Sequence, residues 1–175
     1  MPKPGAQRNF TDSESRIMLG RDGFIQAYNA QAAVDGKGQV ILAHRLTNNV
    51  SDQDGLVPLL NAVAANTGRM PAEVSADNGF CSEANLAAVA QRGVRAYIAT
   101  GRAKHPEGGE ERQRGPLVSA MRLKLRRAGH RSRYRLRKHI VEPVFGHIKQ
   151  ARGFRQILHS SRRATPALYL SLASR

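Results

Sequence analysis

The first half of the chain alternates between apolar runs with strand character and segments with helical periodicity. Two β-compatible runs, FIQAYNAQAAVD at 24–35 and QVILAHRLT at 39–47, flank the tetrapeptide DGKG. Asp and Gly accept the backbone conformations that tight turns require. These two runs therefore predict an antiparallel hairpin.

A helical stripe follows the hairpin. In SDQDGLVPLLNAVAANTG, leucines and a valine recur three and four residues apart, which is the spacing of one helix face. We expect Ser51 to cap this helix, with Asp54 at the third position, and Gly68 to end it.

The rest of the pattern completes an α/β order. It predicts a strand at 72–77, a helix from Ser82 to Gly93, a strand at 94–100, a polar loop at 101–116, and a helical region at about 117–150 interrupted at Gly129 and Pro143. A hairpin followed by strand, helix and strand predicts a mixed sheet, antiparallel and then parallel, flanked by helices.

Charge divides the chain into two parts. The net charge is +15, and residues 1–100 contribute none of it, because nine basic and nine acidic side chains cancel there. Residues 122–138 hold nine Lys or Arg and no acid. Such a block is the electrostatic footprint of a nucleic-acid binder. A solvated basic tail is the plainer alternative.

Three carboxylates stand out against this background. Glu142 is the only acid after Glu111. Asp77 falls where a predicted strand ends, at the edge where open α/β sheets bind ligands, although DNG is also a turn signal. Asp12 precedes the hairpin and also fits the first turn of a helix, because Thr11 followed by Glu14 is a capping-box pattern. Carboxylates from distant segments can gather on Mg²⁺ or Mn²⁺, which prefer hard oxygen ligands.

Four blocks, taken together and in order, are specific. TDSESRIM, FIQAYNAQAAVD, SADNGF and RKHIVEPVFGHIKQARGFR, which cover most of residues 8–157, resemble the catalytic domain of bacterial insertion-sequence transposases of the Asp-Asp-Glu (DDE) type. The resemblance implies a ribonuclease-H-like fold, with a three-strand meander followed by alternating helices and strands. It implies the catalytic and metal-binding acids Asp12, Asp77 and Glu142, with the first on or just after the first strand.

The implied reaction is DNA transposition. Two Mg²⁺ or Mn²⁺ ions support hydrolysis at a transposon end, and the freed 3′-hydroxyl then attacks target DNA. The expected partner is double-stranded DNA, with a homodimer in the DNA complex. The expected DNA-binding residues are Arg122, Lys124, Arg126, Arg127, Arg131, Arg133, Arg135, Arg137, Lys138, Lys149 and Arg152.

The resemblance has departures. Lys138 and Lys149 stand at the family's basic offsets from the glutamate, but Arg135 stands where a tyrosine is expected, with Tyr134 one step away. Pro143 cannot donate an amide hydrogen bond, so the helix either starts near Val141, with Glu142 in its first turn, or kinks there.

The expected organisation is one catalytic domain. It spans residues 1–160 and includes the basic segment 117–155; residues 161–175 form an atypical tail, and the family's N-terminal DNA-binding region is missing. The sequence has one cysteine, no signal-peptide pattern and no apolar run long enough for a membrane span. These features favour a cytoplasmic protein associated with the nucleoid.

Three alternatives stay open. An inactive transposase remnant would bind DNA through residues 122–138 without cutting it. An RNA-binding accessory protein would have no carboxylate site. Within the transposase interpretation, Asp35 is the rival to Asp12 for the first catalytic acid, although its place at the start of a hairpin turn explains it without chemistry.

Overall fold

The computed structural model describes residues 12, 14–20, 23–101, 115–128, 133–148 and 164–173. Its strands are β1 (Arg16–Gly20), β2 (Gly23–Asp35), β3 (Ile41–Thr47), β4 (Glu73–Ala76), β5 (Arg95–Ile98) and β6 (Ala164–Ala173). Its helices are α1 (Leu56–Thr67), α2 (Glu83–Gln91), α3 (Pro116–Ala128) and α4 (Arg137–Gly146), with short 3₁₀ turns η1 (Gln53–Gly55), η2 (Asn78–Phe80) and η4 (Arg133–Leu136). The predicted order of strands and helices is confirmed, but α4 runs through Pro143 without the predicted interruption. The predicted break at Gly129 and most of the predicted loop at 101–116 lie outside the described residues.

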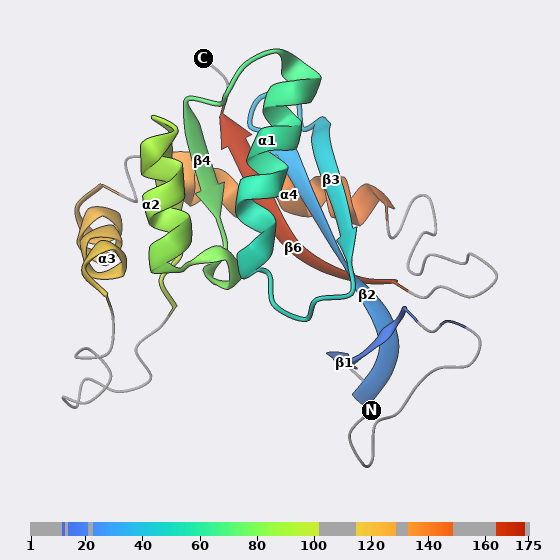
Figure 1. Ribbon diagram of the computed structural model, residues 1–175. Coiled ribbons are helices and arrows are strands. Elements are labelled where there is room, and N and C mark those ends of the chain that lie inside the picture. The colour runs from blue at the N-terminus through green and yellow to red at the C-terminus, as the bar shows by residue number, and fades with distance from the viewer. Residues whose placement is uncertain are drawn as a thin grey trace.

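One mixed sheet joins all six strands (Figure 1). The first part of β2 pairs with β1 and the second part lies between β3 and β6, while β4 lies between β6 and β5. Strands β1, β2 and β3 form an antiparallel meander, and β4 and β5 are parallel. The mixed antiparallel and parallel sheet is therefore confirmed.

Strand β6 was not predicted. It comes from the segment that the sequence set apart as an atypical tail, yet it runs parallel to β2 and antiparallel to β4 between them. The first strand also differs from the expectation, because β1 begins at Arg16 and Asp12 therefore precedes it.

The hairpin turn explains Asp35 structurally. Its Oδ2 accepts hydrogen bonds from the backbone amides of Lys37 at 3.0 Å and Gly38 at 2.6 Å. Its own amide donates to the carbonyl of Val40 at 2.8 Å. Asp35 is thus a turn residue in this structure, as the hairpin pattern predicted.

Helix ends follow their predicted chemistry in two of three cases. Ser82 caps α2 by accepting the amide of Asn85 at 3.2 Å, and Gly68 ends α1 with a left-handed φ of 73°. The prediction for Ser51 is wrong, because α1 begins at Leu56 after η1. Asp52 is the residue before η1, and its carboxylate serves buried amides instead of capping.

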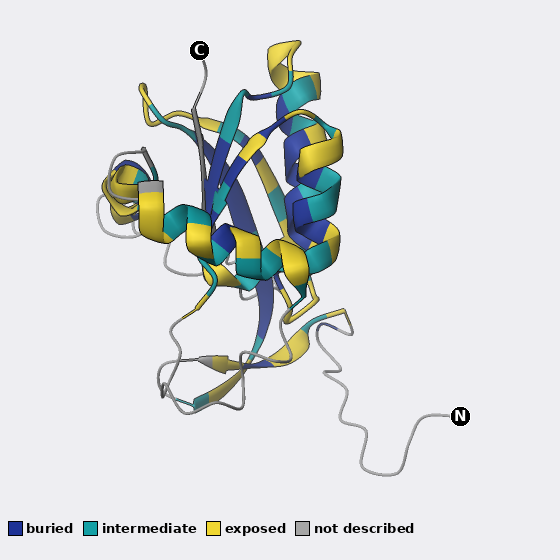
Figure 2. Cartoon of the chain, turned by 90° about the vertical axis from the view of Figure 1, so that its left-hand side faces the viewer, coloured by how far each residue is buried: buried dark blue, intermediate teal, exposed yellow. Residues whose placement is uncertain are grey.

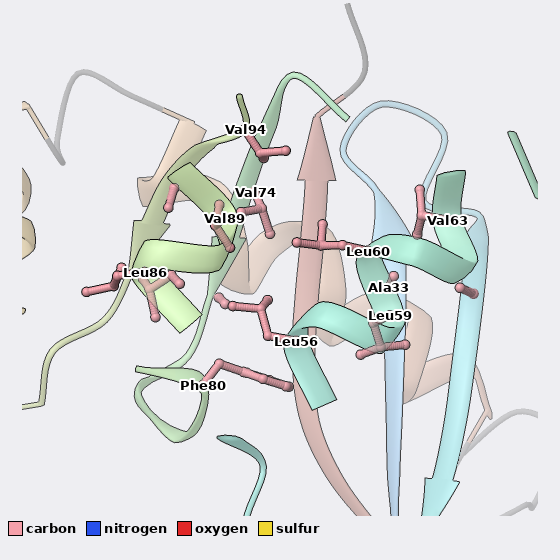
Figure 3. Close-up of a cluster of buried hydrophobic side chains, with 14 of the residues drawn as sticks. Ala33, Leu56, Leu59, Leu60, Val63, Val74, Phe80, Leu86, Val89 and Val94 are labelled. Carbon is pink, nitrogen blue, oxygen red and sulfur yellow. The ribbon is translucent and has the colours of Figure 1, made fainter. Parts of the chain in front are cut away.

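The two faces of the sheet carry different helices. Helices α1 and α2 cover one face and α4 crosses the other, with buried positions turned toward the strands (Figures 1 and 2). The larger core lies under α1 and α2 and is completed by Phe80 of η2 and Met121 of α3 (Figure 3). The predicted helical stripe of α1 forms its centre, since Leu56, Leu59 and Leu60 are almost completely buried.

Helix α4 packs on the other face through Ile140, Val141 and Phe145, which meet Ala32 and Val34 of β2. It begins at Arg137, so the alternative in which a helix starts near Val141 is wrong and Glu142 lies in mid-helix.

Pro143 of α4 leaves one carbonyl of the helix without its usual donor. Because proline has no N–H, the carbonyl of His139 receives no helical hydrogen bond from it. The side chain of Gln39, a residue with φ of 55° beside the hairpin turn, donates its Nε2 to that carbonyl at 3.1 Å. The hairpin therefore ties the middle of α4 to the sheet.

The two serines provide a test of the helix starts. Ser82→Ala removes a true cap and should lower the free energy of unfolding by about 1 kcal/mol. Ser51→Ala should lower it by only a few tenths, because its hydroxyl accepts just one exposed bond, from the Gln53 amide at 3.3 Å. Urea denaturation of the two variants measures the difference, and equal losses would contradict the observed start of α1.

Candidate active site and nucleic-acid interface

Asp77 lies where β4 ends and η2 begins. Its backbone is extended, and its carbonyl accepts the amide of Phe80 at 3.2 Å, which closes the turn. Its Oδ1 is 3.3 Å from Nε of Arg137 on α4, and the two side chains remain 30% and 24% exposed. The predicted acid at the carboxyl edge of the sheet is thus accessible and already paired with a cation.

The sheet register relates the end of β4 to β2. Leu170 of β6 pairs with Ala33 on one side and with Ala76 on the other, so the end of β4 lies level with a point near the carboxyl end of β2. Asp12 instead contacts Tyr28, and the strand from Ala33 back to Tyr28 covers roughly 16 Å. The register thus relates the end of β4 to Ala33, several residues along β2 from the tyrosine that contacts Asp12.

Asp12 is buried and accepts hydrogen bonds from Tyr28 and from its own loop. The hydroxyl of Tyr28 lies 2.8 and 2.9 Å from its two carboxylate oxygens, and the amide of Glu14 donates to Oδ1 at 3.2 Å. The hydroxyl of Ser15 donates to the Asp12 carbonyl at 2.8 Å. In this structure Asp12 fixes the chain as it enters β1.

Glu142 is exposed on α4, and Asp77 contacts the same helix through its bond to Arg137. Among the described residues, no three His, Cys, Asp or Glu side chains gather closely enough to hold a metal ion. The carboxylates have the hard-oxygen chemistry that Mg²⁺ and Mn²⁺ require. Their positions in this structure do not form a three-acid metal centre.

A buried polar cluster beside Asp77 escaped the sequence analysis. Asp52 is 7% exposed, and its Oδ1 accepts Nδ2 of Asn29 at 2.6 Å and Nε2 of Gln31 at 3.0 Å. The Cα of Gly79, in the η2 turn, packs against the same carboxylate. The available signal was the pair of amides at alternate positions in an otherwise apolar strand, which places both on one face.

Helix α3 carries part of the basic block and is anchored at its start and through Lys124. The carboxylate of Glu83 accepts the amides of Leu117 at 3.1 Å and Val118 at 2.8 Å, which caps the start of α3. Further along, Lys124 donates to the carbonyl of Ala96 at 2.8 Å, with its Nζ 4.2 Å from the Tyr97 ring centroid. Burial lowers the pKa of Lys124, partly offset by Glu73 and reinforced by Arg95.

The basic side chains differ in their availability to a ligand. Arg126, Arg127, Arg135 and Lys138 are exposed, whereas Arg122, Lys124 and Arg137 are half-buried. Lys124 and Arg137 also have the internal partners described above. Arg131, Lys149 and Arg152 lie outside the described residues, and for Arg133 only the backbone is described.

The comparisons identify the chain. Residues 6–175 match the family model for the transposase DDE domain. The chain belongs to this transposase family. The match includes the segment that forms β6, and no curated protein or solved structure matches the chain.

Membership defines the broad chemistry. Transposases act on DNA, and DDE domains generally use divalent metal ions, so DNA and a divalent cation are the substrate and cofactor classes that this family implies. None of the helices in the described ranges is long and apolar enough to cross a membrane.

Gly79 provides a test of the buried cluster. A Cβ at this position would lie 2.6 Å from Oδ2 of Asp52, so Gly79→Ala must displace the η2 turn or the carboxylate. We expect a loss of about 1–3 kcal/mol in the free energy of unfolding. Gly146→Ala is the matched control, because a Cβ there meets nothing within 4 Å and alanine favours a helix. Chemical denaturation that gave both variants wild-type stability would contradict the close contact.

Proposed function

We propose that this chain is the catalytic part of a DDE transposase that cuts transposon ends and joins the freed 3′-hydroxyl to target DNA. A ribonuclease-H-like fold is part of the proposal, and the antiparallel meander β1–β2–β3 followed by the parallel pair β4 and β5 supports it. The family match provides the chemical class. The protein would act in the cytoplasm at the nucleoid.

The observation that carries the proposal is the contact between Asp77 and Arg137. It brings the carboxyl end of β4 against the helix that bears Glu142, although 65 positions separate the two acids in the sequence. Helix α4 also packs on β2 through its apolar face. Two of the three proposed acids are thereby carried on elements in direct contact.

The proposed roles follow the chemistry of each side chain. Asp77 and Glu142 would hold Mg²⁺ or Mn²⁺, which would activate the attacking oxygen and stabilise the leaving one. Asp12 remains the proposed first acid, and it would have to exchange its hydrogen bonds with Tyr28 for that role. Asp35 is less suited, because its carboxylate holds the hairpin turn.

DNA would lie along the basic helices. The exposed side chains Arg126 and Arg127 of α3 and Arg135 and Lys138 near α4 are free to face solvent and would pair with phosphates. A DNA complex with two protomers stays part of the proposal. The same surface favours a second candidate, a transposase remnant that binds DNA without cutting it.

Substitutions that remove a charge but keep the side-chain shape distinguish the active transposase from a remnant that only binds DNA. Asp77→Asn and Glu142→Gln keep side-chain shape but remove a metal-binding charge, so nicking of a transposon-end duplex with Mn²⁺ should fall by about a hundredfold or more. DNA binding without metal should be unchanged or slightly tighter, because a repulsive charge is gone.

The control for the nicking assay is Asp54→Asn, which removes an exposed acid beyond the proposed site and should nick at the wild-type rate. Wild-type nicking by Glu142→Gln would disprove its assigned role. Salt-dependent DNA binding by a wild-type chain that never nicks would favour the remnant.

Salt titration tests the DNA surface. Log affinity for duplex DNA should fall linearly with log salt, and each phosphate contact adds about 0.9 to the slope. Arg126→Ala combined with Arg127→Ala should therefore reduce the slope by about 1.8. The control, Lys37→Ala with Arg69→Ala, removes the same charge from exposed positions outside the basic block. If the two double variants gave the same slope, the basic helix would be only a solvated surface.

A further inference from the structure

Arg137 is held from two sides. Its Nε contacts Asp77 at 3.3 Å, and its Cζ lies 4.4 Å from the ring centroid of Tyr134. Both members of the ion pair keep about a quarter of their side-chain surface in water. Such a partly exposed pair is weak enough to be replaced by a better cation.

The pairing sets the orientation of α4. Arg137 lies three and four residues before Ile140 and Val141, so it shares their sheet-facing side of the helix. Glu142 is five residues after Arg137, which places it about 140° further around the helix axis. With Arg137 turned toward Asp77, Glu142 therefore lies on another side of the helix, where it is exposed.

We propose that Arg137 competes with a divalent cation for Asp77 and thereby acts as a positioning residue for the helix that carries Glu142. The inference rests on the proposed function and adds a role that the family match does not assign. A divalent cation at Oδ1 of Asp77 would repel the Arg137 guanidinium 3.3 Å from the same oxygen, because like charges at short range repel. Binding of a divalent cation there therefore weakens the contact between Arg137 and Asp77.

Release of Arg137 has two consequences. Helix α4 loses a polar contact that holds it against the end of β4, while the bond from Gln39 to the His139 carbonyl and the packing of its apolar face remain. The freed guanidinium becomes available for a phosphate, which it can bind with two parallel hydrogen bonds. A metal ion at Asp77 would thus take the place of Arg137, and Arg137 would then be free to bind a phosphate of DNA.

The test measures Mn²⁺ binding to the DNA-free chain, from the electron paramagnetic resonance signal of unbound Mn²⁺. Arg137→Gln should bind Mn²⁺ about fivefold more tightly than the wild type, which is the effect of removing one partly exposed ion pair. Lys138→Gln removes the same charge from the next position, which is exposed, and should change the affinity less than twofold. Asp77→Asn should abolish the gain in the Arg137→Gln background.

Several outcomes would overturn the inference. Equal affinities for Arg137→Gln and wild type, equal gains for Arg137→Gln and Lys138→Gln, or a gain that survives Asp77→Asn would each do so. If Arg137→Gln unfolds below the assay temperature, Arg137→Met keeps the apolar stem beside Tyr134 and should show the same gain.

The nicking assay separates this inference from the proposed function. A Mn²⁺ gain that depends on Asp77, in a chain that never nicks DNA, would support the competition and disprove the transposase activity. Nicking that depends on Asp77, without any Mn²⁺ gain in Arg137→Gln, would leave the activity intact and overturn only the role of Arg137.

Discussion

The ion pair between Asp77 and Arg137 joins the two halves of the chain. An acid at the end of β4 belongs to the neutral half of the sequence, and the arginine on α4 belongs to the half that holds all the net positive charge. An isolated carboxylate near so many cations attracts one of them, and the apolar packing of α4 on β2 determines which one can reach it. The same packing fixes the position of Glu142, which lies on α4.

The polar cluster beside Asp77 packs against the turn that follows it. Asp52 accepts amides from Asn29 and Gln31, and a glycine at position 79 allows the turn to approach its carboxylate. Within the described residues, Asn29 Oδ1 and Gln31 Oε1 are buried without a hydrogen-bond partner. Retaining such costly polar groups in a small core is typical of a site that requires a fixed geometry more than maximal stability.

Local chemistry made much of the fold predictable from sequence. The leucine stripe of α1, the Ser82 cap and the turn at Asp35 each depend on residues within a few positions of one another. Contacts across the chain were not predictable in this way. No local pattern shows that Arg137 rather than Lys138 meets Asp77, or that Asp12 bonds to Tyr28 sixteen residues later. Strand β6 was missed because its pairing depends on two strands much earlier in the sequence.

The central place of β6 has a consequence for biosynthesis. Asp35 of β2 pairs with Leu172, and Val74 of β4 pairs with the same residue from the other side. The facing edges of these strands stay unpaired until residues 164–173 have left the ribosome, since β6 is the last strand within the described residues. Long-range pairing of this kind slows folding and exposes strand edges to other chains. Nascent copies of this protein should therefore depend on chaperones, or on low expression, to avoid edge-to-edge association.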